Sequence, residues 1–128
     1  MKDNMAFQLA VHESLKRDPR YASQAYAFVC AALEHTVKIQ QKEEESRHVT
    51  GQELLAGLRD LAVQEFGPMA LFVLNDWGIH QSSDVGNMVY NFINIGYFGK
   101  NETDNIEDFS DGVDMQEALT RPFRTLKK

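Results

Sequence analysis

The residue types best suited to catalysis or metal binding are scattered along this 128-residue chain. The four histidines are His12, His35, His48 and His80. They fall in four separate segments, and no two share the short helical spacing that is typical of a metal site. Arg47 and His48, just before the predicted helix that starts at Thr50, form the one local group with catalytic residue types. Because a helix N-terminus attracts anions, Arg47 and His48 are a candidate anion-binding or enzymatic site.

The acidic stretch from 101 to 117 raises the question of calcium binding, since Ca²⁺ prefers carboxylate oxygens. If Gly112 takes the sixth position of an EF-hand loop, Phe109 and Ala118 fall on ligand positions that need oxygen. The EF-hand interpretation therefore fails, and no cofactor is predicted. An irregular cation site is the lesser alternative to a solvated acidic surface that binds a partner. The carboxylates predicted to bind a partner are Asp104, Glu107, Asp108 and Asp111.

A polar stripe marks a helix predicted over 82–97. Its members are Asp84, Asn87, Asn91 and Asn94, and they are expected to face outward. With the shorter helix before it and the glycine turn at Gly78, this helix resembles the second helix of a winged helix-turn-helix, which enters the major groove of DNA. Asparagine can read adenine edges, but most contacts to DNA need groups that hold phosphate. Packing or protein contact is therefore favoured over nucleic acid.

The distribution of charge supports this choice. The net charge is −6, and residues 65–128 carry ten Asp/Glu against five Lys/Arg, whereas residues 1–64 are nearly balanced. No Lys or Arg lies between Arg59 and Lys100. Polyanions and anionic membranes are attracted through clustered cations, so neither is a predicted partner. A transcription-related winged helix remains the alternative, and it would depend on the basic tail residues Arg121, Arg124, Lys127 and Lys128.

The pattern of apolar residues predicts an all-α fold with five main helices. Three-and-four spacing places them over 4–16, 23–41, 50–66, 68–77 and 82–97, with a short last helix over 115–119. Ser23 is the predicted N-cap of the second helix, and Thr50 with Glu53 forms a capping box for the third. Gly67 and Gly78 are expected to end the third and fourth helices. The helix over 82–97 has the most complete apolar stripe and is predicted to be core.

These elements are predicted to form one domain of residues 1–128. A helical pair (4–41) and a charged linker (42–47) precede a helix-turn-helix-like part (48–99) and an acidic segment with the tail (100–128). A hairpin is slightly favoured over an irregular loop in the acidic segment. Trp77 is either an exposed anchor for a partner or a half-buried plug at the end of the core. The single Cys30, the absence of a signal-like start and the lack of a long apolar run predict a cytoplasmic protein.

Several short motifs resemble a small bacterial protein family of unknown function, found mainly in planctomycetes, verrucomicrobia and neighbouring lineages. They are Asp18-Pro19-Arg20-Tyr21, Ala25-Tyr26, the stretch from Arg47 to Leu55, Phe66-Gly67-Pro68, Trp77-Gly78-Ile79 and Glu107-Asp108-Phe109. The family's Asp-Phe-Gly at the start of the fifth helix is replaced here by Asp84-Val85-Gly86. The resemblance covers 18–123 and implies a bacterial, cytoplasmic, single-domain protein. It implies no activity, ligand or catalytic residue.

The function predicted from the sequence is that of a non-enzymatic protein-interaction or adaptor domain. Its contact surface would combine Trp77, the polar stripe and the acidic segment, and would suit a basic protein partner. Nucleic-acid binding is the alternative, and the site near Arg47 and His48 is the third hypothesis. Self-association is left open.

Overall fold

The computed structural model describes residues 4–40, 49–98 and 114–123, and these form helices joined by short turns. The α-helices are α1 (Asn4–Arg17), α2 (Ser23–Gln40), α3 (Gly51–Phe66), α4 (Ala70–Asp76), α5 (Ser82–Asn94) and α6 (Met115–Thr120). Two 3-10 turns, η2 (Gly67–Met69) and η4 (Arg121–Phe123), follow α3 and α6. No strand occurs among the described residues. The prediction of an all-α domain with five main helices and a short last one is confirmed.

The predicted capping box starts α3. The Glu53 amide donates to the Thr50 hydroxyl at 3.1 Å, and the Thr50 amide donates to the Glu53 carboxylate at 3.0 Å. Two amides that lack partners within the helix are thereby satisfied. At the other end, Gly67 has a φ of 56° and its amide donates to the carbonyl of Val63. The predicted start and end of this helix are therefore confirmed.

Three other predicted boundaries were wrong by a few residues. The helix expected over 68–77 is divided into η2 and α4. Ser23 lies inside α2, because the carbonyl of Ala22 already accepts a hydrogen bond from Ala25. Helix α5 ends at Asn94 rather than near Tyr97, since Gly96 takes a φ of 87°, a left-handed conformation that terminates a helix.

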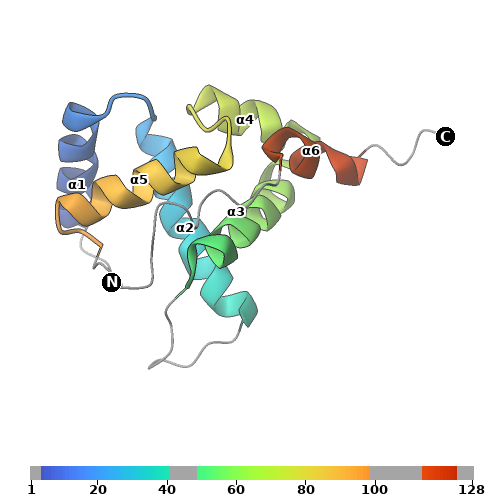
Figure 1. Ribbon diagram of the computed structural model, residues 1–128, viewed down its shortest axis with the longest axis horizontal. Helices are drawn as coiled ribbons and strands as arrows, with labels where there is room; N and C mark the ends of the chain where they lie inside the picture. Colours follow the sequence, from blue (N-terminus) through green and yellow to red (C-terminus); the bar gives the residue numbers. More distant parts are fainter. Residues whose placement is uncertain (1–3, 41–48, 99–113, 124–128) are drawn as a thin grey trace.

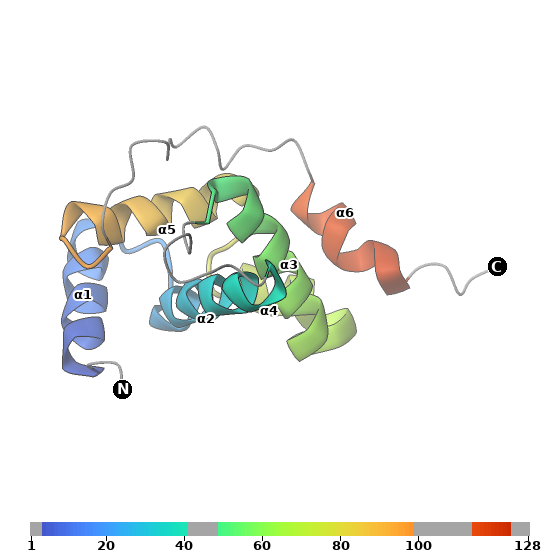
Figure 2. The same ribbon diagram turned by 90° about the horizontal axis from the view of Figure 1, so that it is seen from below.

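Helices α1 and α6 lie at opposite ends of the molecule, and the C-terminal (orange) end of α5 lies beside α1 while its N-terminal end lies towards α3 (Figures 1 and 2). Helices α2 and α3 form the most extensive helix pair, whereas α4 packs on α3 and α6. Gly57 of α3 permits the close approach to α2, because a Cβ at this position would overlap the hydroxyl of Thr36. Thr36 is itself buried, and its hydroxyl donates to the carbonyl of Ala32.

Two groups of aromatic rings fill the core. Phe92 of α5 lies at the centre of the first, with its ring centroid 4.9 Å from those of both Tyr26 and Tyr97. The second group joins Phe28 of α2 to Phe66 and Trp77. The prediction that the fifth helix is core is confirmed, since the apolar side chains on its inner face are buried. They are Val85, Met88, Val89 and Phe92.

Several predictions concern residues outside the described ranges. These are the charged linker 42–47, the Arg47/His48 site, the hairpin or loop in the acidic segment with its carboxylates, and the tail cations Arg124, Lys127 and Lys128. All of them stay predictions. In the described ranges, no helix is both long enough and apolar enough to cross a bilayer.

Candidate functional site

The polar stripe of α5 does not form the outward surface that the sequence predicted. Asp84 is only 8 % exposed, and Asn87 and Asn91 are partly buried against the segment that joins α1 to α2. Only Asn94 is exposed. The outward placement was therefore wrong for three of the four residues. The physical reason for the burial is that Tyr21 and Tyr26 bring their phenol groups to this face of α5. Residues of the polar stripe form hydrogen bonds with these phenol groups.

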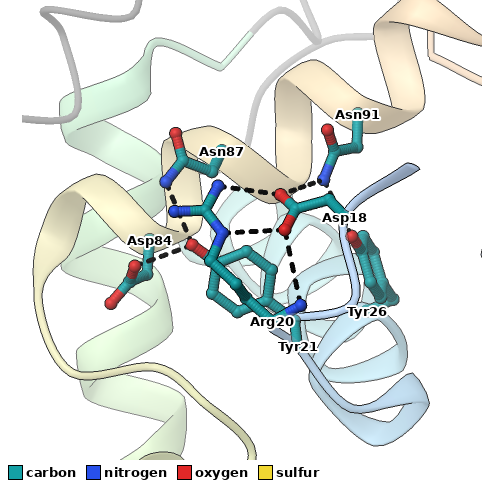
Figure 3. Close-up of polar contacts among 7 residues, drawn as sticks. All are labelled: Asp18, Arg20, Tyr21, Tyr26, Asp84, Asn87 and Asn91. Atoms are coloured by element: carbon teal, nitrogen blue, oxygen red, sulfur yellow. Dashed lines mark hydrogen bonds and ion pairs between the residues drawn. The ribbon is translucent and has the colours of Figure 1, made fainter. Parts of the chain in front are cut away.

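Asp84 occupies the inner end of this polar network (Figure 3). Its Oδ1 accepts a hydrogen bond from the Tyr21 hydroxyl at 2.7 Å, and its Oδ2 accepts from the amides of His80 and Gln81 at 2.8 and 3.0 Å. The amide nitrogen of Asn87 donates to the same Tyr21 oxygen at 3.0 Å. The Asp84 carboxylate thus holds Tyr21 of the loop before α2 in place. It also accepts hydrogen bonds from two backbone amides at the start of α5, where helix geometry provides no acceptor.

The outer end of the network is an ion pair between Asp18 and Arg20. The guanidinium donates to both carboxylate oxygens, with distances of 2.7 and 2.8 Å. Asn91 of α5 donates to Asp18 at 3.1 Å and to the Tyr26 hydroxyl at 2.9 Å (Figure 3). The Arg20 side chain is 60 % exposed, whereas that of Asp18 is 13 % exposed. A bidentate pair fixes the orientation of an arginine, so Arg20 is held in place at the surface over the ring of Tyr21.

The surroundings of Asp18, Tyr21 and Tyr26 shift the pKa of each of these groups. The hydrogen bonds from Arg20 lower the pKa of Asp18 to about 2, against the opposing effect of burial. Burial raises the pKa of Tyr21 to about 12, and it also raises the pKa of Tyr26. Near neutral pH, Asp18 is therefore ionised and both phenols are neutral. In these states, Asp18 and the two phenols serve as hydrogen-bonding groups that join the loop before α2 and the start of α2 to α5.

Acid should weaken the fold through Asp18 in a defined pH range. Because the pKa of Asp18 is lower in the folded chain (about 2) than its ordinary value of 3.8, the unfolded chain takes up the proton first. The stabilisation is complete above pH 3.8 and is lost as the pH falls towards 2.

Between these pH values, the free energy of unfolding of the wild type should fall by about 1–2 kcal/mol more than that of Asp18→Asn, allowing for solvent screening. Urea unfolding of both proteins across this range measures it, with Glu13→Gln as a surface control. Equal slopes for the wild type and Asp18→Asn would contradict the ion pair.

The network also bears on the nucleic-acid hypothesis. Arg20 lies beside the polar stripe of α5, and the two carboxylates of the network, Asp18 and Asp84, outnumber it. Asp18 already uses two of the N–H groups of Arg20. The local charge therefore remains unfavourable for phosphate.

Trp77 is half-buried rather than fully exposed. Its ring lies 5.7 Å from that of Phe28 and 5.8 Å from that of Phe66, and its carbonyl accepts a hydrogen bond from the Ala22 amide at 3.0 Å. The residue thus closes one end of the core and ties the loop before α2 to the turn before α5. Its role in binding a partner stays a prediction.

An open groove of about 350 Å³, which was not predicted from the sequence, lies between α2 and α3. Phe28, Ala31, Leu61 and Phe66 supply its apolar lining. Its polar lining consists of Glu34, His35 and Lys38 of α2 and Glu65 of α3. The spacing of Ala31, Glu34 and Lys38 on one face of α2 is visible in the sequence. The packing of α2 against α3, which brings this face beside Leu61, Glu65 and Phe66, is not visible there.

The two rims of the groove carry carboxylates that nothing else in the described ranges engages. Glu34 and Glu65 are exposed, and neither makes a hydrogen bond or ion pair with the other described residues. His35, in contrast, lies 2.8 Å from the carboxylate of Asp60, which also accepts a hydrogen bond from Gln64 at 2.8 Å. The groove therefore combines an apolar floor with two carboxylates available to a ligand.

The other chemistry-bearing residues stay apart. His12 is exposed on α1, and the ring of His80 lies 3.1 Å from the side-chain oxygen of Asn75. Across 4–40, 49–98 and 114–123, no three of the His, Cys, Asp and Glu side chains converge as metal ligands would. Neither a family model, nor a curated protein, nor a solved structure matches the chain. The resemblance to a bacterial family, and with it the bacterial origin and cytoplasmic location, stays a prediction.

Proposed function

We propose that this chain is a protein-interaction module that binds a basic protein partner through the groove between α2 and α3. The observation that carries the proposal is the apolar floor between two uncommitted carboxylates, Glu34 and Glu65. Apolar pockets with a few charged groups at their edges are the usual form of a binding site. Electrostatic complementarity then selects partners of opposite charge and speeds their association.

The overall charge supports a basic partner over a second copy of the chain. With a net charge of −6, two copies repel one another, whereas a basic protein is attracted. The predicted acidic surface of Asp104, Glu107, Asp108 and Asp111 would add to this attraction. In this proposal the groove supplies the apolar contact, and the acidic segment contributes long-range attraction.

The polar stripe has a different role in this proposal. Asp84, Asn87 and Asn91 hold the loop before α2 in place, so they position α2 rather than contact the partner. Winged-helix nucleic-acid binding remains the alternative, but Arg20, a surface cation beside the polar stripe of α5, is already paired with Asp18. A site at Arg47 and His48 remains the third hypothesis.

Filling the groove tests the proposal. Ala31 is exposed and lines the groove, so Ala31→Trp should block it while leaving α2 intact. Ala56→Trp is the matched control, because Ala56 is exposed on α3 and does not line the groove. We expect a basic protein captured from cells that express the chain to be retained by the wild type and Ala56→Trp and lost from Ala31→Trp. Capture that is equal for all three proteins would refute binding in the groove.

A further inference from the structure

We infer that the occupant of the groove is an amphipathic helical segment with an aromatic anchor and a Lys or Arg on each side of it. The inference rests on the proposed function and names the chemistry of the partner. An open groove between two helices is the form that accepts a helix through anchors one turn apart. At about 350 Å³, the groove is at the small end of binding pockets and suits individual side chains.

The floor of the groove favours an aromatic anchor. The rings of Phe28 and Phe66 lie 5.6 Å apart at an angle of 38°, and Trp77 meets Phe66 edge-on at 5.8 Å. Phe28 and Phe66 also line the groove. A further ring placed on this group adds tilted or edge-to-face contacts, which stabilise beyond the burial of area alone. Trp77 contacts both of these rings and is not among the residues that line the groove.

The groove has one carboxylate on each of its two helices, so an aromatic residue of the partner bound in the groove would have a carboxylate on either side. Glu34 belongs to α2 and Glu65 to α3, so a cation on only one side of the anchor would leave the other carboxylate without a partner. Lys38 lies one helical turn beyond Glu34 on the same rim and repels a cation at that end. A uniform polycation is therefore a poorer match than a segment whose cations flank one apolar anchor.

Synthetic peptides test this inference on the full chain. The probe is a fluorescent helical peptide with one phenylalanine and one leucine a turn apart, and lysines on both sides. One comparison peptide has glutamine in place of the lysines, and another has serine in place of the two apolar residues. The proteins are the wild type, Ala31→Trp, Glu34→Gln/Glu65→Gln and the control Glu13→Gln/Asp76→Asn. The control changes the net charge equally but alters carboxylates away from the groove.

We expect fluorescence anisotropy to show about fivefold weaker binding of the lysine peptide to Glu34→Gln/Glu65→Gln, and less than twofold weakening for the control. The glutamine peptide should bind both proteins equally, and the serine peptide should not bind. If Ala31→Trp abolishes binding but Glu34→Gln/Glu65→Gln does not weaken it, the flanking cations are refuted and only the apolar anchor in the groove stands. If Ala31→Trp binds as the wild type does, or if no peptide binds, the helical segment anchored in the groove is refuted. The capture experiment with Ala31→Trp and Ala56→Trp then decides the proposed function separately.

Discussion

Replacing Gly78 by alanine is expected to destabilise the fold by about 3–4 kcal/mol. Gly78 has a φ of 99°, which L-residues rarely adopt. A Cβ at this position would also overlap the carbonyl oxygen of Arg20 and come within 3.2 Å of the Tyr21 ring. The Arg20 carbonyl belongs to the backbone, so it cannot move away as a flexible side chain would. The loop before α2 would have to separate from the turn before α5.

Gly96 provides the control for this experiment. It has a similar φ of 87°, but a Cβ there would meet nothing within 4 Å. Gly96→Ala should therefore lower the free energy of unfolding only through the strain of a positive φ in alanine, by about 1 kcal/mol. Urea unfolding of both variants measures the difference, which reports the contact with Arg20. Equal losses for Gly78→Ala and Gly96→Ala would contradict the close approach of the two segments.

Asp84→Ala is expected to destabilise the fold by about 3 kcal/mol. The buried carboxylate accepts hydrogen bonds from the Tyr21 hydroxyl and from the amides of His80 and Gln81, and alanine would remove all of these acceptors. The Tyr21 hydroxyl bond to Asp84 is buried, and the two amide bonds are partly buried. A buried donor that loses its partner destabilises a protein more than an average hydrogen bond stabilises it. Chemical unfolding measures this loss directly.

A second aspartate separates the effect of burial from that of helix capping. Asp114 caps α6 through the Gln116 amide at 3.2 Å, but it is exposed. Asp114→Ala should therefore cost only about 1 kcal/mol. A double-mutant cycle of Asp84→Ala with Tyr21→Phe should show that the two losses are not additive, because the residues share a hydrogen bond. Additive losses would contradict the pairing.

Helix positions were predictable because they depend on local chemistry. The capping box of Thr50 and Glu53 and the apolar stripe of α5 are both encoded within a few residues, and both are confirmed. The end of α5 was placed too late, because the apolar pattern continues through Tyr97. The left-handed Gly96 stops the helix before the pattern ends. Local patterns thus predicted the elements better than their exact ends.

The surroundings of the polar stripe were not predictable, because they depend on contacts between distant residues. Asn91 is hydrogen-bonded to Asp18, 73 positions away, and Asp84 is hydrogen-bonded to Tyr21, 63 positions away. Helical spacing shows that Asp84, Asn87 and Asn91 share a face, but a polar face is expected to meet water unless polar partners cover it. The groove was missed for the same reason, since it forms only when α2 and α3 pack in register.

The hydrogen bonds from α5 to the loop before α2 also affect the order in which the domain folds during synthesis. The phenol groups of Tyr21 and Tyr26 bond to Asp84, Asn87 and Asn91, which leave the ribosome more than sixty residues later. Contacts over such separations are slow to form because a long loop must close first. The first two helices therefore emerge well before the residues that pair with their buried tyrosines. Native packing of this half of the chain has to wait until α5 has been translated.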